Sequence, residues 1–217
     1  MKEKKDITRL QKPVIVHGDD SKESLGLVHV YTGDGKGKTT ASLGLAMRAA
    51  GNGLQVYIIQ FLKACETGEL HAIEKLPNIT IVQFGVGMEG EMQKSIHEYE
   101  ELLKRDGSKE TGTRFAFMAD RDEKTACQRA FDHAKKIIKS GDYDLVVLDE
   151  VNCAMNKGLV PVEEVLELMQ DHGHTELVFT GWGAPERIKE KADYVSFVQK
   201  MKHPYEKGIK ARRGIEY

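Results

Sequence analysis

The sequence predicts an α/β domain in which helices cover both faces of a mostly parallel β-sheet. Short apolar runs typical of buried strands recur along the chain, and helical patterns separate most of them. This alternation is typical of a parallel sheet, because each strand returns to the same edge through a helical crossover. The six predicted strands are residues 27–31, 56–62, 79–84, 145–148, 177–180 and 194–198.

A glycine-rich loop follows the first predicted strand and precedes a helical stretch that ends near Ala50. Its glycines let backbone N–H groups turn inward around phosphate, while Lys38 supplies a positive charge and Thr39 a hydroxyl for Mg²⁺. Thr32 stands where the common phosphate-loop pattern has glycine. The loop predicts a P-loop NTPase-like (RecA-like) fold that binds a nucleoside triphosphate. The loop residues expected to hold it are Thr32, Gly33, Asp34, Gly35, Lys36, Gly37, Lys38, Thr39 and Thr40.

A second element of a phosphate site is the aliphatic run at 145–148, which delivers Asp149 and Glu150 at its carboxyl end. In an open parallel sheet the ligand crevice lies outside the carboxyl ends, so both carboxylates are expected to face Lys38 and Thr39. We expect Mg²⁺ to bridge Thr39, Glu150 and Asp149 to the triphosphate, with Glu150 nearest the metal and Asp149 behind it. An acidic strand end that only caps the following helix is the alternative.

Composition indicates one domain. With 217 residues, 40% of them hydrophobic, the chain can bury one substantial core, and no Pro- or Ser-rich linker divides it. We expect a flexible N-terminal arm at 1–24 and a single domain at 25–217. The net charge of −2 gives no reason to expect a nucleic-acid partner.

The cysteines and the N-terminus favour a cytoplasmic protein. Cys65, Cys127 and Cys153 show no paired C-x-x-C spacing, so neither a disulfide framework nor a zinc site is indicated. The charged N-terminus has no apolar stretch after it, and no run of about twenty apolar residues occurs, which predicts neither secretion nor a membrane span.

The alternation breaks between Gly85 and Asp120, where glycines and charges replace the apolar runs. We expect a long, mobile insertion over the sheet edge or the active-site face, with a helix at 91–104. This insertion bears on which ligand fits, and it can carry a partner-binding helix.

Several landmarks resemble the ATP:corrinoid adenosyltransferases, in the same order along the chain. The loop at 32–40 resembles that family's Thr-Gly-x-Gly-Lys-Gly-Lys-Thr-Thr, and residues 60–63 with 68–69 resemble its Gln-Phe-Ile-Lys…Gly-Glu. Residues 149–159 resemble its Asp-Glu-x-Asn-x-Ala-x-x-x-Gly-Leu. The C-terminal part, Lys-His-Pro-Tyr to the final Gly-Ile-Glu-Tyr, is more specific than the loop. The resemblance covers roughly residues 25–217.

The resemblance implies transfer of the 5′-deoxyadenosyl group of ATP to a corrinoid reduced to Co(I), with triphosphate leaving. Because Co(I) is itself a strong nucleophile, the protein needs no Ser, Cys or His nucleophile and supplies binding, orientation and electrostatics. Lys38 and Glu150 take the catalytic roles, and Lys36 and Lys38 with Mg²⁺ stabilise charge on the departing triphosphate. The ATP is expected to present C5′ to the corrinoid, in an unusual orientation in the loop.

The resemblance also adds binding residues outside the loop. Arg48 falls at the family's helix arginine, and Lys63 and Asn152 lie in its other motifs. Phe115 and Phe117 resemble a Phe-x-Trp pair and are candidates for an apolar cover over the corrinoid, although ordinary core residues are the alternative. The implied partners are ATP, the reduced corrinoid, an electron donor such as a flavoprotein-type reductase, and a second subunit in a homodimer.

Two departures from the family pattern keep three functions open. Trp182 stands where the family has arginine, and Phe197 stands where it has glutamate. The first function is the adenosyltransferase. The second is a P-loop ATPase of motor or kinase type, in which Glu150 polarises water or positions an acceptor and ADP is the product. The third is a corrinoid- or nucleotide-binding protein without turnover.

Overall fold

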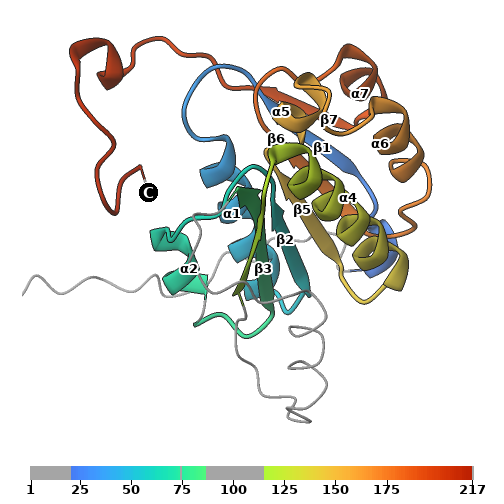
Figure 1. The fold of residues 1–217 in the computed structure, drawn as a ribbon. Coiled ribbons are helices and arrows are strands. Elements are labelled where there is room, and N and C mark those ends of the chain that lie inside the picture. The colour runs from blue at the N-terminus through green and yellow to red at the C-terminus, as the bar shows by residue number, and fades with distance from the viewer. Residues whose placement is uncertain (1–20, 74, 87–114, 217) are drawn as a thin grey trace, which may run out of the picture.

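The computed structural model describes residues 21–73, 75–86 and 115–216. Its centre is a seven-stranded sheet in the order β4-β3-β2-β5-β6-β1-β7, in which every neighbouring pair is parallel (Figure 1). The strands are β1 (Val28–Thr32), β2 (Val56–Gln60), β3 (Ile79–Val86), β4 (Phe115–Asp120), β5 (Leu145–Asp149), β6 (Glu176–Thr180) and β7 (Tyr194–Phe197).

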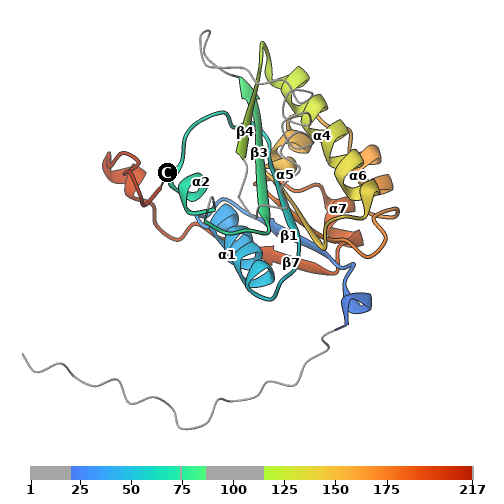
Figure 2. The same ribbon diagram turned by 90° about the horizontal axis from the view of Figure 1, so that it is seen from below.

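Helices pack on both faces of this sheet (Figure 2). α1 (Lys38–Gly51) and α2 (Gly68–Ile73) lie on one face, and the later α-helices lie on the other. Within the described ranges, no helix combines the length and the apolar character that crossing a membrane requires. The later helices are α4 (Glu123–Ser140), α5 (Val151–Asn156), α6 (Val162–Leu168) and α7 (Glu186–Lys191), and the short 3₁₀ helices are Lys22–Ser24 and Pro204–Lys207.

Two apolar layers join the helices to the sheet. Ile58 of β2 packs in the layer that contains Ala46 of α1, whereas the next residue, Ile59, packs in the layer that contains Phe131 of α4. This follows from the alternation of side chains along a strand. All five residues of β2 and all five of β5 are buried. Strands buried on both faces are continuous apolar runs, which is why these two were predictable.

The predicted fold class is confirmed, and in the described residues the sheet is parallel throughout. The six strands expected from the sequence are present, with bounds that differ by no more than two residues.

The prediction is wrong at one strand. Residues 115–120 were assigned to an insertion, yet they form β4, which pairs with β3 so that Phe117 lies opposite Gln83. An edge strand has only one neighbour, and here it follows a charged segment, so its short apolar run is a weak signal. The helix expected at 91–104 lies outside the described residues.

The predicted N-terminal arm overlaps the described residues only at 21–24. There the Lys22 ammonium donates to both carboxylate oxygens of Asp144, each at 2.8 Å. Asp144 also accepts from the backbone N–H of Gln55 at 2.8 Å, so it joins three segments at the amino edge of the sheet. The boundary at residue 24 stays a prediction.

A close backbone approach at the end of β3 fixes the segment that follows β2. The N–H of Lys63 donates to the carbonyl of Phe84 at 3.0 Å. A Cβ added to Gly85 would come within 2.7 to 2.9 Å of the Lys63 backbone, so a larger residue forces the two segments apart. The sheet therefore holds Lys63 at its carboxyl edge.

Gly85→Ala should lower the free energy of unfolding by about 1–3 kcal/mol, the usual cost of forcing atoms into a packed site. Gly44→Ala is the control, because a Cβ there meets nothing within 4 Å on an exposed part of α1. That variant should gain about 0.5–1 kcal/mol from the higher helix propensity of alanine. Urea unfolding measures both, and equal stabilities would contradict the close approach.

Candidate active site

A hollow of about 370 Å³ lies at the carboxyl edge of the sheet, beside the glycine-rich loop. The loop residues in its wall are Gly35, Lys36, Gly37, Lys38, Thr39 and Thr40. The remaining wall consists of Leu43, Lys63, Gly68, Glu69, Glu150, Gly214, Ile215 and Glu216. Most of the predicted phosphate-binding residues therefore face one cavity, together with a C-terminal segment far away in the sequence.

The loop presents the N-terminus of α1 to this hollow. The helix begins at Lys38, directly after Gly37, whose φ of 119° is a left-handed conformation that favours glycine. Among the described residues, no side chain caps this end and no acidic residue stands in the first turn. The Lys38 ammonium donates to the carbonyls of Gly33 at 2.8 Å and Gly35 at 2.7 Å. Uncapped N–H groups, the helix dipole and this ammonium together suit an anion such as phosphate.

The segment after β7 supports the loop from outside. The N–H of Gly35 donates to the carbonyl of Val198 at 2.7 Å, and the N–H of Lys200 donates to the Asp34 carboxylate at 2.9 Å. The latter bond holds the pKa of Asp34 below its ordinary value. A Cβ on Gly33 would collide with the Val198 carbonyl, and one on Gly35 would lie 2.8 Å from it. These glycines therefore serve close packing as well as the turn.

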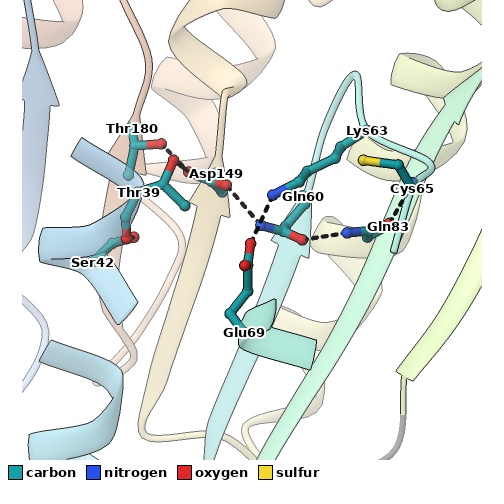
Figure 3. A network of polar contacts seen from close by, with 9 residues as sticks. All are labelled: Thr39, Ser42, Gln60, Lys63, Cys65, Glu69, Gln83, Asp149 and Thr180. Atoms are coloured by element: carbon teal, nitrogen blue, oxygen red, sulfur yellow. Dashed lines mark hydrogen bonds and ion pairs between the residues drawn. The ribbon is translucent and has the colours of Figure 1, made fainter. Parts of the chain in front are cut away.

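Asp149 is the centre of the polar contacts behind the loop (Figure 3). It is 1% exposed, and its carboxylate accepts from Thr39 Oγ1 at 2.8 Å, from Gln60 Nε2 at 2.9 Å and from Thr180 Oγ1. These donors come from α1, from the end of β2 and from the end of β6, the two strands that flank β5. Burying a carboxylate is costly unless donors compensate it, and here they converge on both oxygens.

Glu150 follows in a left-handed conformation, with φ of 66°. Burial raises the pKa of its carboxyl above the ordinary value, and the neighbouring Asp149 acts in the same direction. The Cys153 thiol donates to the Glu150 carboxylate at 2.6 Å, and burial raises the pKa of that thiol to about 12. Glu150 is thus a partly buried carboxyl in the wall of the hollow, held by a neutral donor.

Lys63 and Glu69 add an ion pair to the wall, with a distance of 2.8 Å between Nζ and the carboxylate. Burial by itself would raise the pKa of Glu69, but the hydrogen bond and charge of Lys63 hold it below the ordinary value. Of the predicted site residues outside the glycine-rich loop, two line the hollow, Lys63 and Glu150.

The donor set fits Mg²⁺. Thr39 gives its hydroxyl hydrogen to Asp149, which leaves its oxygen lone pairs for a cation, and Glu150 lines the same hollow. In the described part of the chain, no cluster of three or more His, Cys, Asp or Glu side chains is placed to hold a metal. Mg²⁺ needs none, because it keeps several waters and binds one or two carboxylates with substrate phosphates. The arrangement is compatible with the predicted order of Glu150 and Asp149, which stays a prediction.

Other predicted binding residues lie beside or away from the hollow. Thr32 is buried and accepts from the N–H of Ala184 at 3.2 Å, so its side chain joins the end of β1 to the loop that follows β6. Asn152 is fully buried, and its amide nitrogen lies 3.4 Å from carbonyl oxygens at the ends of β1 and β6. Phe115 and Phe117 lie on the edge strand β4, and their role as a corrinoid cover stays a prediction.

The structure places Arg48 away from the loop hollow, and its role as a binding residue stays a prediction. Arg48 lies in the last turn of α1, ten residues after Lys38, which places it about 15 Å along the helix from the loop. There it borders a separate hollow of about 550 Å³ at the opposite edge of the sheet, with Lys22 and Asp144.

Sequence reasoning gave no role to three residues of the Asp149 network. Gln60 and Thr180 are the polar residues that end the apolar strands β2 and β6, and Gln83 is a buried amide inside β3. A polar residue that interrupts or closes a buried strand is the available signal, because burying an amide without a partner is costly.

A family model described as ATP:corrinoid adenosyltransferase BtuR/CobO/CobP matches residues 24–217. The chain belongs to this family. A corrinoid adenosyltransferase of Escherichia coli (strain K12) is 30% identical, over 96% of this chain and 94% of that protein. Corrinoid adenosyltransferase CobA of Salmonella typhimurium (strain LT2) is 33% identical, over 91% and 88%. A corrinoid adenosyltransferase of a Sinorhizobium species is 34% identical, over 88% and 80%.

Membership in the corrinoid adenosyltransferase family, which is a family of transferases, confirms the predicted resemblance. The two residues at which the sequence departs from the expected pattern, Trp182 and Phe197, lie on strands or loops on either side of the glycine-rich loop. Trp182 follows β6 and Phe197 ends β7, the strands that flank β1, and their exposed fractions are 51% and 69%. The chain therefore exposes two aromatic side chains beside the strand that leads into the glycine-rich loop.

Glu150→Gln should stabilise the folded protein at neutral pH. The pKa of Glu150 is raised in the folded state, so the stability linked to its proton is present below the ordinary pKa of 4.5 and is lost as the pH rises through the folded value. The difference in unfolding free energy between the variant and the wild type should therefore grow as the pH rises from below 4.5 to neutrality. Urea unfolding at several pH values measures it, with Glu190→Gln on α7 as the matched control. A constant difference would contradict the partial burial of this charge.

Proposed function

We propose that the protein transfers the 5′-deoxyadenosyl group of ATP to the Co(I) of a reduced corrinoid and releases triphosphate, in the synthesis or salvage of adenosylcobalamin. The observation that carries this proposal is that a member of the corrinoid adenosyltransferase family presents a phosphate loop, Lys38 and Thr39 to one hollow with Glu150. The family description names ATP and corrinoid, and both enter the proposal as substrates.

The proposed step makes one bond and breaks one bond. The electron pair of Co(I) attacks C5′ of the ribose, a cobalt–carbon bond forms, and the C5′–O bond breaks with its electrons on the triphosphate. No side-chain nucleophile and no water-activating base take part. The protein would orient the reactants and stabilise the charge that develops on the leaving triphosphate. Lys36, Lys38 and the first turn of α1, which line the hollow, support this role.

Mg²⁺ is part of the proposal. Thr39 and Glu150 would hold it, with Asp149 orienting Thr39, and its charge would reduce the repulsion among the phosphate oxygens. We also retain as proposals an apolar cover from Phe115 and Phe117, an electron donor such as a flavoprotein-type reductase, a homodimer and a cytoplasmic location.

The wild-type protein should form adenosylcobalamin and triphosphate in equal amounts. The measurement is an anaerobic incubation with MgATP, a cobalamin and a strong chemical reductant, in which the corrinoid spectrum, triphosphate and ADP are followed separately. ADP without a spectral change would favour a P-loop ATPase instead. Binding of both substrates without either product would favour a non-catalytic binding protein.

Lys38→Ala should weaken MgATP binding by about 10- to 100-fold, because hydrogen bonds to charged groups contribute about 1.5–3 kcal/mol. Isothermal titration calorimetry without corrinoid isolates this effect from the chemical step. Lys136→Ala is the control, since Lys136 is exposed on α4, on the other face of the sheet. Equal loss of affinity in both variants would contradict binding of the triphosphate at the loop.

A further inference from the structure

Two buried glutamines connect Asp149 to the segment that follows β2 (Figure 3). Gln60 and Gln83 are 0% and 1% exposed, and they lie opposite each other on the neighbouring strands β2 and β3. Gln83 Nε2 donates to Gln60 Oε1 at 2.8 Å, and Gln60 Nε2 donates to Asp149 Oδ2 at 2.9 Å. At the other end, Gln83 Oε1 accepts from the backbone N–H of Cys65 at 3.1 Å.

This chain of hydrogen bonds can run in only one direction. The Cys65 N–H at one end is a donor, and the Asp149 carboxylate at the other end accepts. Each glutamine between them must therefore turn its carbonyl toward Cys65 and its NH₂ group toward Asp149. Reversing either amide would place two carbonyl oxygens or two NH₂ groups against each other, so both ends fix the orientation of both side chains.

The chain of hydrogen bonds also fixes the orientation of the Asp149 carboxylate. Gln60 binds Oδ2, while Thr39 and Thr180 bind Oδ1. A rotation of the carboxylate that moves Oδ1 away from Thr39 would also break the bond to Gln60. Without Gln60, this buried carboxylate would keep donors on one oxygen and lose the donor that holds the other.

We infer that Gln60 and Gln83 are positioning residues, which hold Asp149 so that it orients the Thr39 hydroxyl for a metal-bound nucleotide. This inference rests on the proposed function only in taking MgATP as the ligand. Neither glutamine lines the hollow, and both act through Asp149. The chain of hydrogen bonds begins at the backbone N–H of Cys65. It therefore also links the orientation of Asp149 to the segment 61–67, which places Lys63 in the wall of the hollow.

The test separates metal-dependent from metal-independent binding. Gln60→Met and Gln83→Met keep the length of the side chain and remove its hydrogen bonds. The dissociation constant of ATP is measured by calorimetry with Mg²⁺ and again with a chelator. We expect each variant to bind ATP about 10- to 100-fold more weakly with Mg²⁺, the usual effect of residues that orient metal ligands, and to match the wild type without it.

Tyr57→Phe is the matched control, because it removes another buried hydrogen bond of β2. The Tyr57 hydroxyl lies 2.7 Å from His133 Nε2, in the layer on the α4 side. This variant should lose stability without changing the Mg²⁺ dependence of ATP binding. Because the two glutamines act in one chain of hydrogen bonds, their effects should not add. The double variant Gln60→Met with Gln83→Met should lose little more affinity for MgATP than Gln60→Met alone.

Equal weakening with and without Mg²⁺, or unchanged binding in both conditions, would overturn the inference. If Gln60→Met does not fold, Gln83→Met carries the test, because its side chain does not contact Asp149. Failure of the proposed function is seen separately, in the products made by the wild type. If the wild type forms no adenosylated corrinoid, the proposed function fails but the binding result still stands. If the wild type forms adenosylated corrinoid and the variants bind MgATP as tightly as it does, only the positioning role is refuted.

Discussion

The carboxylate of Asp149 is the interaction on which the candidate site depends. It is buried, and donors from α1, β2 and β6 meet on its two oxygens. Those donors come from elements that are distant in sequence, so the carboxylate joins the start of α1 to both neighbours of β5. Removing one donor would leave a buried charge partly unpaired, which costs more than the hydrogen bond itself contributes.

The glycine-rich loop is held from its outer side by a second constraint. The backbone at 198–199 approaches Gly33 and Gly35 so closely that a side chain at either position would collide with it. The loop is therefore held on two sides. Asp149 binds Thr39 on one side, and the segment that follows β7 contacts the loop on the other. The same C-terminal part of the chain supplies residues 214–216 to the hollow, so its wall combines segments from both ends of the described domain.

Much of the fold and part of the site were predictable, for a local reason. β2 and β5 are apolar at nearly every position, and the loop residues with Asp149 and Glu150 are recognisable from spacing in short segments. β4 was not predicted, because its single run follows a charged segment. Contacts such as Gln83 with Gln60, or Thr180 with Asp149, depend on the order of strands in the sheet. Alternation of strands and helices predicts a parallel sheet but leaves that order open.

A crystal structure with bound MgATP is the most direct test of this account. We predict that the triphosphate lies on the first turn of α1 and that the metal lies about 2.0–2.1 Å from Thr39 Oγ1, the distance typical of Mg²⁺. Asp149 should still accept hydrogen bonds from Thr39 and Gln60. A triphosphate bound elsewhere, for example beside Arg48, or a metal without Thr39 among its ligands, would contradict the central role of Asp149 and Thr39.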